Sequence, residues 1–430
     1  MNTSLDNLTH KMQRAALGKI VDVALSRAEQ DREKTMCQLV DAAKQFYGSG
    51  FSDETYENAK KVLTDPNSKW TKLINCVLDQ TDPHVARTTA LNLGYEAFFR
   101  GTKMIRENRV KYQCNIPWLI LFDPTSACNM HCVGCWAGEY GNKNNLSFDD
   151  MDKIVTQGKE LGVYLYMLTG GEPLVRKNVA QLVAGLKATP GIRRVTLTTN
   201  AVLLAEQLPA LLDAGLDSVN ISLDTLRPEV FRQITARDDF AAVQTGLQAA
   251  LESGLPVKLN CVPQAGVNEG ELEQLAALAK DNALQVRFIE MMPIGYGAAM
   301  PCISGPELRA RFARRWPELA PLSAAQEHAL GDGPAVYYTV PGWQGSIGFI
   351  AAVHGKFCAS CNRVRLTSQG FLRPCLASET GCDLRALLRS GADDAQLLAA
   401  IWETIWAKPR EHHFNDSSMP ATRGMYRIGG

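Results

Sequence analysis

Apolar positions along the first 110 residues repeat with the period of an α-helix. The stretches "MCQLVDAAKQFY" and "HVARTTALNLGYEAFFRGTKMI" carry apolar residues three and four apart, and strand-like alternation is almost lacking. This pattern predicts a helical N-terminal extension over residues 1–112. We identify no catalytic constellation within it.

From about residue 117, short runs rich in β-branched and aromatic residues alternate with amphipathic helical stretches. Six such strand–helix repeats predict a parallel sheet covered by helices. An open or partial (βα)6 barrel over residues 113–298 fits this order, with reactive groups at the carboxyl ends of its strands. The expected strands are "WLILF", "YLYMLT", "RRVTLTT", "DSVNIS", "PVKLNCV" and "QVRFIEM".

The repeat ends near residue 300. Short strands in "AVYYTV" and "GSIGFIAAV", a cysteine-bearing segment and two helices between residues 383 and 407 predict a small α+β domain over residues 299–430 that covers the barrel mouth. Lysine usage also changes, with thirteen lysines in residues 1–160 and five from residue 181 onward. This change in lysine content indicates either compositional drift or the fusion of two ancestral sequences.

Charge and hydropathy exclude several classes of protein. Lysine plus arginine equals aspartate plus glutamate at 45 each, so no global field would recruit nucleic acid or an acidic membrane. No run of 18 apolar residues occurs, and the start of the chain lacks the apolar core of a signal peptide. We therefore expect a cytoplasmic protein, in which twelve cysteines stay reduced and clustered ones serve as metal ligands or catalysts.

Three cysteines, Cys128, Cys132 and Cys135, follow the first expected strand directly. A structural zinc site is normally closed by four ligands, and His131 could complete this set only by straining the loop. A cubane iron–sulfur cluster takes one thiolate per iron and would leave its fourth iron open to another ligand. We expect a [4Fe-4S] cluster here, with zinc as the alternative.

The stretch "TGGEP" ends the second expected strand. Its glycines allow close approach of the backbone to a ligand, and Glu172 can accept a hydrogen bond from an ammonium. Together with the cysteine loop, this stretch resembles the radical S-adenosylmethionine superfamily. The resemblance implies that S-adenosylmethionine is bound by Gly170, Gly171, Glu172, Thr199, Asn200 and Ser222. For the last three, capping of the following helices is the alternative.

A second cysteine group, Cys358, Cys361 and Cys375, lies in "FCASCNRVRLTSQGFLRPCL". Zinc would find a fourth ligand for this group in Cys382 or His354. Arg363 and Arg365 alternate along an expected strand and would project to one side. Paired guanidinium groups bind phosphate or carboxylate well, although a solvated strand face has the same pattern.

Residues 168–430 resemble the GTP 3′,8-cyclase family of molybdenum cofactor biosynthesis, in "LTGGEPLVR", "NISLDTL", "RFIEMMPIG", the second cysteine segment and the terminal "RGMYRIGG". The resemblance implies conversion of GTP to (8S)-3′,8-cyclo-7,8-dihydroguanosine 5′-triphosphate, with a second [4Fe-4S] cluster that binds the purine. It also implies contacts to substrate or cofactor from Lys258, Arg287, Arg363 and Arg365, and a tail, Gly429 and Gly430, that reaches the active site with the two arginines. The implied partners are cyclic pyranopterin synthase downstream and an electron donor such as flavodoxin or ferredoxin, and a homodimer is one possible assembly.

The chain departs from this family in its first half. Leu121, Leu165 and Met167 stand where the family carries basic residues, and residues 110–178 resemble another radical S-adenosylmethionine subgroup. Two alternatives therefore stay open: a radical enzyme that modifies another substrate, such as a peptide, and a non-catalytic metal-binding module. His412 and His413 are expected at the surface.

Overall fold

The computed structural model describes residues 3–28, 31–47, 53–80, 87, 91, 107, 110–114, 116–133, 135, 145–294, 300–323, 330, 333–355, 357–358, 361–378, 380–412 and 414. The chain forms two compact units, Met1–Tyr112 and Gln113–Gly430.

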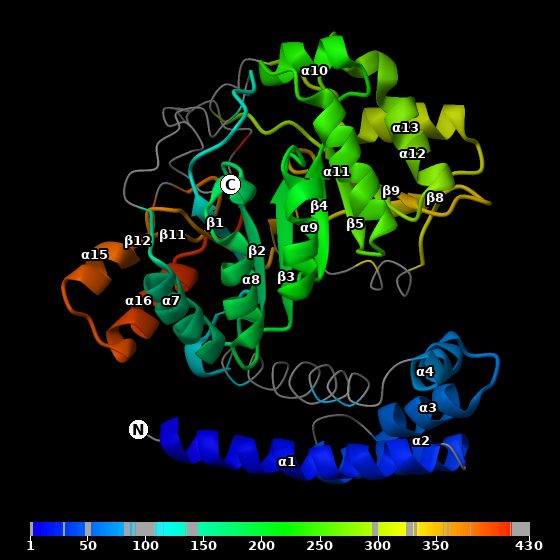
Figure 1. Cartoon of the computed structure of the whole chain (residues 1–430), viewed down its shortest axis with the longest axis vertical. Coiled ribbons are helices and arrows are strands. Elements are labelled where there is room, and N and C mark those ends of the chain that lie inside the picture. The colour runs from blue at the N-terminus through cyan, green and yellow to red at the C-terminus, as the bar shows by residue number, and fades with distance from the viewer. Residues whose placement is uncertain are drawn as a thin grey trace. The chain divides into compact units, whose positions relative to one another are not determined.

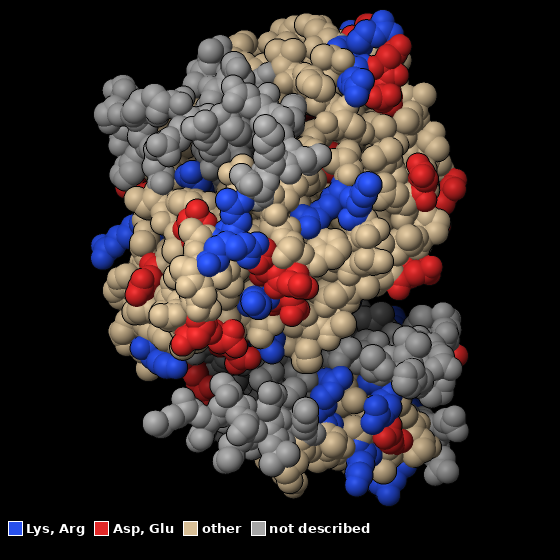
Figure 2. Space-filling view, turned by 60° about the vertical axis from the view of Figure 1, so that its left-hand side comes forward, with Lys and Arg blue, Asp and Glu red and all other residues tan. Residues whose placement is uncertain are grey.

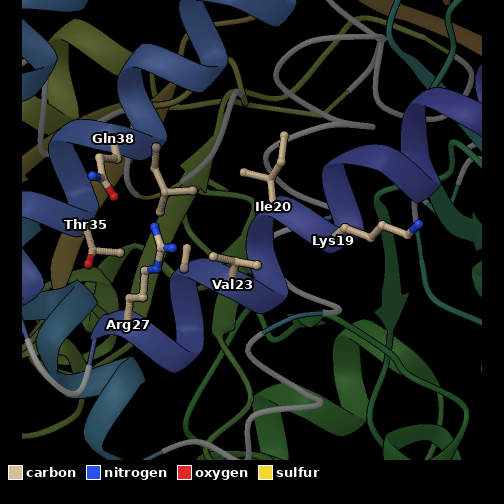
Figure 3. A pocket seen from close by; sticks show the side chains of 8 residues that line it. Lys19, Ile20, Val23, Arg27, Thr35 and Gln38 are labelled. Carbon is tan, nitrogen blue, oxygen red and sulfur yellow. The ribbon is translucent and has the colours of Figure 1, made fainter.

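The first unit is helical where the structure describes it. Its helices are α1 (Thr3–Ala28), α2 (Arg32–Tyr47), α3 (Asp53–Thr64) and α4 (Lys69–Gln80). Leu17 and Val21 of α1 form a small core with Leu91. A pocket of about 290 Å³ is lined by Lys19, Ile20, Val23, Ala24 and Arg27 of α1 and by Thr35, Gln38 and Leu39 of α2 (Figure 3).

The second unit is built on one twelve-stranded sheet with the order β12-β11-β10-β1-β2-β3-β4-β5-β6-β9-β8-β7. The strands are β1 (Leu119–Thr125), β2 (Leu165–Gly170), β3 (Arg194–Thr199), β4 (Ser218–Ser222), β5 (Val257–Cys261), β6 (Gln285–Ile289), β7 (Ala320–Pro321), β8 (Val336–Thr339), β9 (Ser346–Ile350), β10 (Arg363–Leu366), β11 (Phe371–Arg373) and β12 (Cys382–Asp383). The helices are α7 (Phe148–Glu160), η3 (Pro173–Val175), α8 (Val179–Ala188), α9 (Leu204–Asp213), α10 (Pro228–Thr235), α11 (Phe240–Glu252), η4 (Glu269–Glu271), α12 (Leu272–Asp281), α13 (Gly305–Arg315), α15 (Leu384–Arg389) and α16 (Asp394–Trp406).

Strands β1 to β6 confirm the six expected repeats. They are parallel and adjacent in sequence order, and helices α7, α8, α9, α11 and α12 follow them around the outside (Figure 1). The sheet order has two ends, so the barrel is partial, as predicted. Helix α10 was not predicted.

The C-terminal segment extends this barrel at both edges. Strand β10 pairs in parallel with β1, and β9 pairs in parallel with β6. We expected a small domain placed over the barrel mouth, but residues 336–383 instead share one sheet with β1–β6. A domain boundary between residues 298 and 299 stays a prediction.

The two faces of the parallel strands differ in chemistry. On the outer face, Ile120, Phe122, Tyr166, Leu168 and Val219 have no exposed surface. Alternate residues point to the opposite face, and there polar side chains bond to one another, as Asn220 does to Thr198. The alternating apolar and polar positions of β3 to β6 thus give these strands a polar inner face.

On the face shown in Figure 2, basic and acidic side chains are interspersed. In the part of the chain that the structure describes, no helix has both the length and the apolar content needed to cross a membrane.

Candidate functional site: two thiol groups at opposite ends of a barrel

The first cysteine loop is fastened to the end of helix α10. The amide of His131 donates to the carbonyl of Thr235 at 3.1 Å, and that of Val133 donates to Ile234 at 2.7 Å. The Nε of Arg237 donates to the carbonyl of Asn129 at 2.8 Å. Carbonyl groups at a helix C-terminus lack intrahelical partners, so the loop satisfies them while the helix fixes the loop.

The three thiols of this loop are partly buried. Burial raises the pKa of Cys128 to about 11, and the neighbouring charges of Glu172 and Cys135 raise it further. Burial also raises the pKa of Cys132, with contributions from Cys135, Asp224 and Cys128. These raised pKa values keep Cys128 and Cys132 as neutral thiols at neutral pH. Cys128, Cys132 and Cys135 are the residues that would hold an iron–sulfur cluster in this loop.

The two glycines after β2 permit close contact with this same loop. A Cβ on Gly171 would lie 2.2 Å from the carbonyl oxygen of Ala127, and Gly170 has a φ of +103° beside Asp123. The amide of Glu172 donates to the Ala127 carbonyl at 2.7 Å. The glycines therefore allow the backbone to approach the cysteine loop closely, and their close approach to a ligand stays a prediction.

Glu172 is an internal anchor. Its side chain is 1% exposed and accepts from the amide of Leu174 at 3.1 Å, the hydroxyl of Thr199 at 2.7 Å and the amide of Asn200 at 2.7 Å. Burial raises its pKa to about 7, although these three hydrogen bonds oppose that rise. These bonds tie Glu172 to the ends of β2 and β3, and its contact with the ammonium of a ligand stays a prediction.

Asn200 connects this anchor to the first cysteine. Its Nδ2 donates to Oδ1 of Asn129 at 2.7 Å and lies 3.9 Å from Sγ of Cys128. Thr199 is buried, whereas Ser222, at the end of β4, is exposed. Of the residues expected near a nucleoside, Thr199 and Asn200 thus support the cysteine loop, and Ser222 stands open at the carboxyl end of the strands.

Arg287 of β6 reaches across the polar interior. Its Nε donates to Oδ1 of Asn260 at 2.8 Å, and its Nη2 donates to Oδ1 of Asn220 at 2.9 Å. Burial lowers the pKa of this guanidinium. Lys258 of β5 donates from Nζ to the carbonyl of Leu330. Both predicted basic residues therefore come from neighbouring barrel strands.

The wall formed by β1 and β2 is apolar on the same face. In the strand register, Leu119 of β1 lies beside Arg363 of β10 and Leu165 of β2. Leu121 lies in the same way beside Arg365 and Met167. Paired residues of parallel strands point to the same side of the sheet. The three positions at which basic residues were expected thus lie on the face that carries the arginines.

The second thiol group lies at the opposite end of the strands from the first. Cys361 precedes β10, whose first residue pairs with the first residue of β1, while Cys128 follows the end of β1. Antiparallel pairing of β11 with β10 brings Cys375 to the same amino end. We expected the two groups to face each other across the barrel mouth, and this was wrong: seven residues of β1, roughly 20 Å of strand, separate them.

Positive charge surrounds the second group. Burial would raise the pKa of Cys361, but the charges of Lys408, Arg363 and Arg365 outweigh it and lower this pKa. Burial lowers the pKa of Arg363 to about 10, against the opposing charge of Cys361. The guanidinium of Arg363 also lies 5.4 Å from the ring centroid of Phe357. Arg363 and Arg365 thus lie between the two thiol groups along β10.

His412 is buried beside the second group, which corrects the expectation of a surface residue. It is 7% exposed, and its amide lies 3.4 Å from Sγ of Cys358. His413, Gly429 and Gly430 lie outside the described residues. Their predicted places stay predictions.

The structure does not separate zinc from an iron–sulfur cluster, because among the described residues no three His, Cys, Asp or Glu side chains, the six cysteines included, converge as ligands of one metal ion. Nδ1 of His354 is engaged by Glu290. Cys382 belongs to β12 and pairs with Leu372.

Sequence reasoning missed the residues that hold the two thiol groups in place: Asn129, Arg237 and Lys408. One signal was available for Lys408, since it is one of five lysines beyond residue 181 in a stretch that otherwise uses arginine. Nothing local marks Arg237, because its partner lies 108 residues away.

Comparison with known proteins defines the class first. The model of the Radical SAM superfamily matches residues 122–279, which carry the first thiol loop and the strands to β5. A model described as Molybdenum Cofactor Synthesis C matches residues 284–414, which carry the second thiol group. Streptococcus suis SuiB bound to S-adenosylmethionine has a similar structure, with a TM-score of 0.49 and 16% identity, and the match covers 80% of each chain.

Curated relatives narrow the class to one family. GTP 3′,8-cyclase of Heliobacterium modesticaldum is 41% identical over 316 residues, 71% of this chain and 95% of the relative. The enzymes of that name from Moorella thermoacetica and Desulforamulus reducens are each 40% identical, over 71% and 74% of this chain and 95% and 99% of their own. The chain therefore belongs to the GTP 3′,8-cyclase family of the radical S-adenosylmethionine superfamily.

Proposed function

We propose that the chain converts GTP to (8S)-3′,8-cyclo-7,8-dihydroguanosine 5′-triphosphate in molybdenum cofactor biosynthesis. Cys128, Cys132 and Cys135 would hold one [4Fe-4S] cluster at the carboxyl end of the barrel. Cys358, Cys361 and Cys375 would hold a second at the amino end. When bound, the first cluster and S-adenosylmethionine supply the radical that takes a hydrogen atom from the substrate.

The observation that carries this proposal is the position of the arginine-bearing strand. Arg363 and Arg365 of β10 lie on the interior face of the sheet. The first thiol group lies beyond the carboxyl end of the strands, and the second lies at their amino end. A guanidinium binds phosphate through paired hydrogen bonds. A nucleotide lying along β10 would therefore contact both arginines while its two ends approach the two clusters.

The remaining interior side chains supply the rest of the nucleotide site. Arg287 is held rigidly by Asn220 and Asn260, so it can orient an acceptor without reorganising. The ammonium of Lys258 donates to the backbone carbonyl of Leu330, and we propose that it turns toward a phosphate when the nucleotide binds. The Gly429–Gly430 tail would complete the site from the C-terminus. We place Gly170, Gly171, Glu172, Thr199, Asn200 and Ser222 around S-adenosylmethionine, with Glu172 acting through Thr199 and Asn200.

The proposal includes partners of matching chemistry. A flavodoxin or ferredoxin would deliver the electrons, and cyclic pyranopterin synthase would take the product, in the cytoplasm.

A second candidate keeps the radical chemistry and changes the substrate. The apolar wall of Leu121, Leu165 and Met167 favours a less charged substrate, such as a peptide. Family membership and the paired arginines favour GTP.

Anaerobic reconstitution separates the two candidates. The protein is reconstituted with iron and sulfide, reduced with dithionite and supplied with S-adenosylmethionine and GTP. It should form 5′-deoxyadenosine and consume GTP in parallel. Chromatography with mass detection measures both compounds. Cys128→Ala protein should do neither and is the matched control. Formation of 5′-deoxyadenosine with intact GTP would refute the substrate and keep the reaction class.

A further inference from the structure

The segment that follows helix α16 donates hydrogen bonds to two sulfurs of the second thiol group. Nζ of Lys408 lies 3.5 Å from Sγ of Cys361, and the amide of His412 lies 3.4 Å from Sγ of Cys358. The same ammonium donates to the carbonyl of Arg363 and, at 3.2 Å, to that of Pro374. Pro374 adjoins Cys375, so one side chain joins both stretches of chain that carry the cysteines.

Lys408 projects from a firmly packed element. Helix α16 buries Leu397, Ile401 and Ile405 and contacts both α7 and β11. Its last turn continues through the bond from the Lys408 amide to the Ile405 carbonyl at 3.1 Å. The ammonium is therefore placed by the barrel rather than by a free loop.

The field at this group differs from that at the first group. The donors near Cys128 are neutral, the amide of Met130 at 3.4 Å and the side chain of Asn200 at 3.9 Å. Lys408 instead places an ammonium 3.5 Å from Sγ of Cys361 and 3.2 Å from the carbonyl of Pro374, which adjoins Cys375. Hydrogen bonds and net charge near the sulfurs set the reduction potential of an iron–sulfur cluster. A cation favours the reduced form, because reduction adds negative charge.

We propose that Lys408 is the positioning residue of the C-terminal cluster. It holds the Cys361 and Cys375 segments at the spacing that the cluster needs, and it raises the reduction potential of that cluster. The inference rests on the second cluster of the proposed function, and it assigns a role to a side chain outside the three thiols.

The test uses the full chain in a background with only the second group, Cys128→Ala/Cys132→Ala/Cys135→Ala. This background should hold about four irons per chain after anaerobic reconstitution. Adding Lys408→Met should lower retention of iron against a chelator by about 10–100-fold, as expected when an outer partner of a metal ligand is lost. Lys408→Arg, which keeps the charge, should restore most of the retention. Lys280→Met, at an exposed position on α12, is the control and should change nothing.

The reduction potential separates a charge effect from a packing effect. Lys408→Gln keeps a neutral donor, on a side chain one bond shorter, and removes the charge. It serves as the second variant if Lys408→Met does not fold. Its cluster should keep its electron paramagnetic resonance spectrum and show a midpoint potential more negative than that of the background. Unchanged retention in Lys408→Met, or an unchanged potential in Lys408→Gln, would overturn the inference alone. A background without iron would instead overturn the proposed second cluster.

Discussion

The two thiol groups have the same number of cysteines and opposite surroundings. At the carboxyl end of the barrel, burial raises the pKa of Cys128, and the nearby charges of Glu172 and Cys135 add to the effect. At the amino end, Lys408, Arg363 and Arg365 overcome burial and lower the pKa of Cys361. Equal ligand sets can therefore serve unequal tasks, because the protein controls the field around each set. The group in the more negative field suits the donation of an electron, and the group among cations suits the binding of an anionic substrate.

Removing one thiol from each group should produce the largest and most different effects. Cys132→Ala should halve the iron content, from about eight to about four per chain, and abolish formation of 5′-deoxyadenosine. Cys361→Ala should lose the same amount of iron but still cleave S-adenosylmethionine, without consuming GTP. Iron and sulfide assays with product chromatography give both readouts.

Cys302→Ala is the matched control for these variants, since Cys302 is exposed and belongs to neither group. It should keep all the iron and both activities. Identical behaviour of Cys132→Ala and Cys361→Ala would remove the distinction between the two ends.

Adding charge to the apolar wall should give the next largest effect. Leu121 is paired in register with Arg365, so Leu121→Arg places two guanidinium groups side by side and creates a site that an anion would stabilise. A charge-assisted contact contributes about 1.5–3 kcal/mol, which corresponds to about 10–150-fold tighter GTP binding. Equilibrium dialysis of the reconstituted protein with GTP measures this, and Leu121→Met is the control of unchanged charge.

Unchanged binding in Leu121→Arg would mean that the phosphates of GTP do not approach β1. Leu165→Lys, one layer nearer the amino end and paired with Leu119, then tests whether they lie closer to Arg363. If neither variant binds GTP more tightly than the wild type, the result favours the peptide-modifying alternative.

The buried anchor at the carboxyl end should show a pH dependence. Because burial raises the pKa of Glu172 to about 7 from 4.5, the folded state holds this proton more tightly than the unfolded state. Its contribution to the free energy of unfolding is full below about pH 4.5 and is lost as the pH rises through about 7, by up to about 3 kcal/mol. Glu172→Gln should remove this dependence.

Urea unfolding of the iron-free protein at several pH values measures the difference between wild type and Glu172→Gln. Thr199→Val removes one hydrogen bond to the carboxylate at 2.7 Å and should strengthen the dependence rather than remove it. Parallel stability curves for wild type and Glu172→Gln would show that the carboxyl titrates equally in both states.

The smallest effect is expected where α10 ends. Ala236 has a φ of +55° at the C-cap of this helix, a conformation that glycine adopts without steric cost. Because Ala236 is exposed, Ala236→Gly should stabilise the fold by about 0.5–1 kcal/mol. Thermal unfolding checks this, and Ala236→Val, which worsens the strain, should shift the midpoint the other way.

The sequence pattern predicted the local elements well and their long-range pairing poorly. The six parallel strands follow from apolar runs between amphipathic helices, and those runs are confirmed. The residues of strand β10 predict a strand, but they do not indicate whether it pairs within a separate domain or with β1. Its partner is about 240 residues distant, and no local periodicity encodes such pairing.

The same limit explains what was right and wrong about the site. Cysteine spacing identified both thiol groups, and alternation placed Arg363 and Arg365 on one face, because both signals are local. The positions of the groups at opposite ends depended on the β1–β10 register. Helix α10 was missed because eight residues beginning with Pro228 give only a short periodic signal.

The most direct test measures the distance between two reduced clusters in one chain. Reconstituted protein, reduced with dithionite and examined by pulsed electron paramagnetic resonance, should contain two interacting paramagnetic centres roughly 20 Å apart, the length of strand β1. A single centre, or two centres at less than half this separation, would contradict two clusters at opposite ends of the barrel.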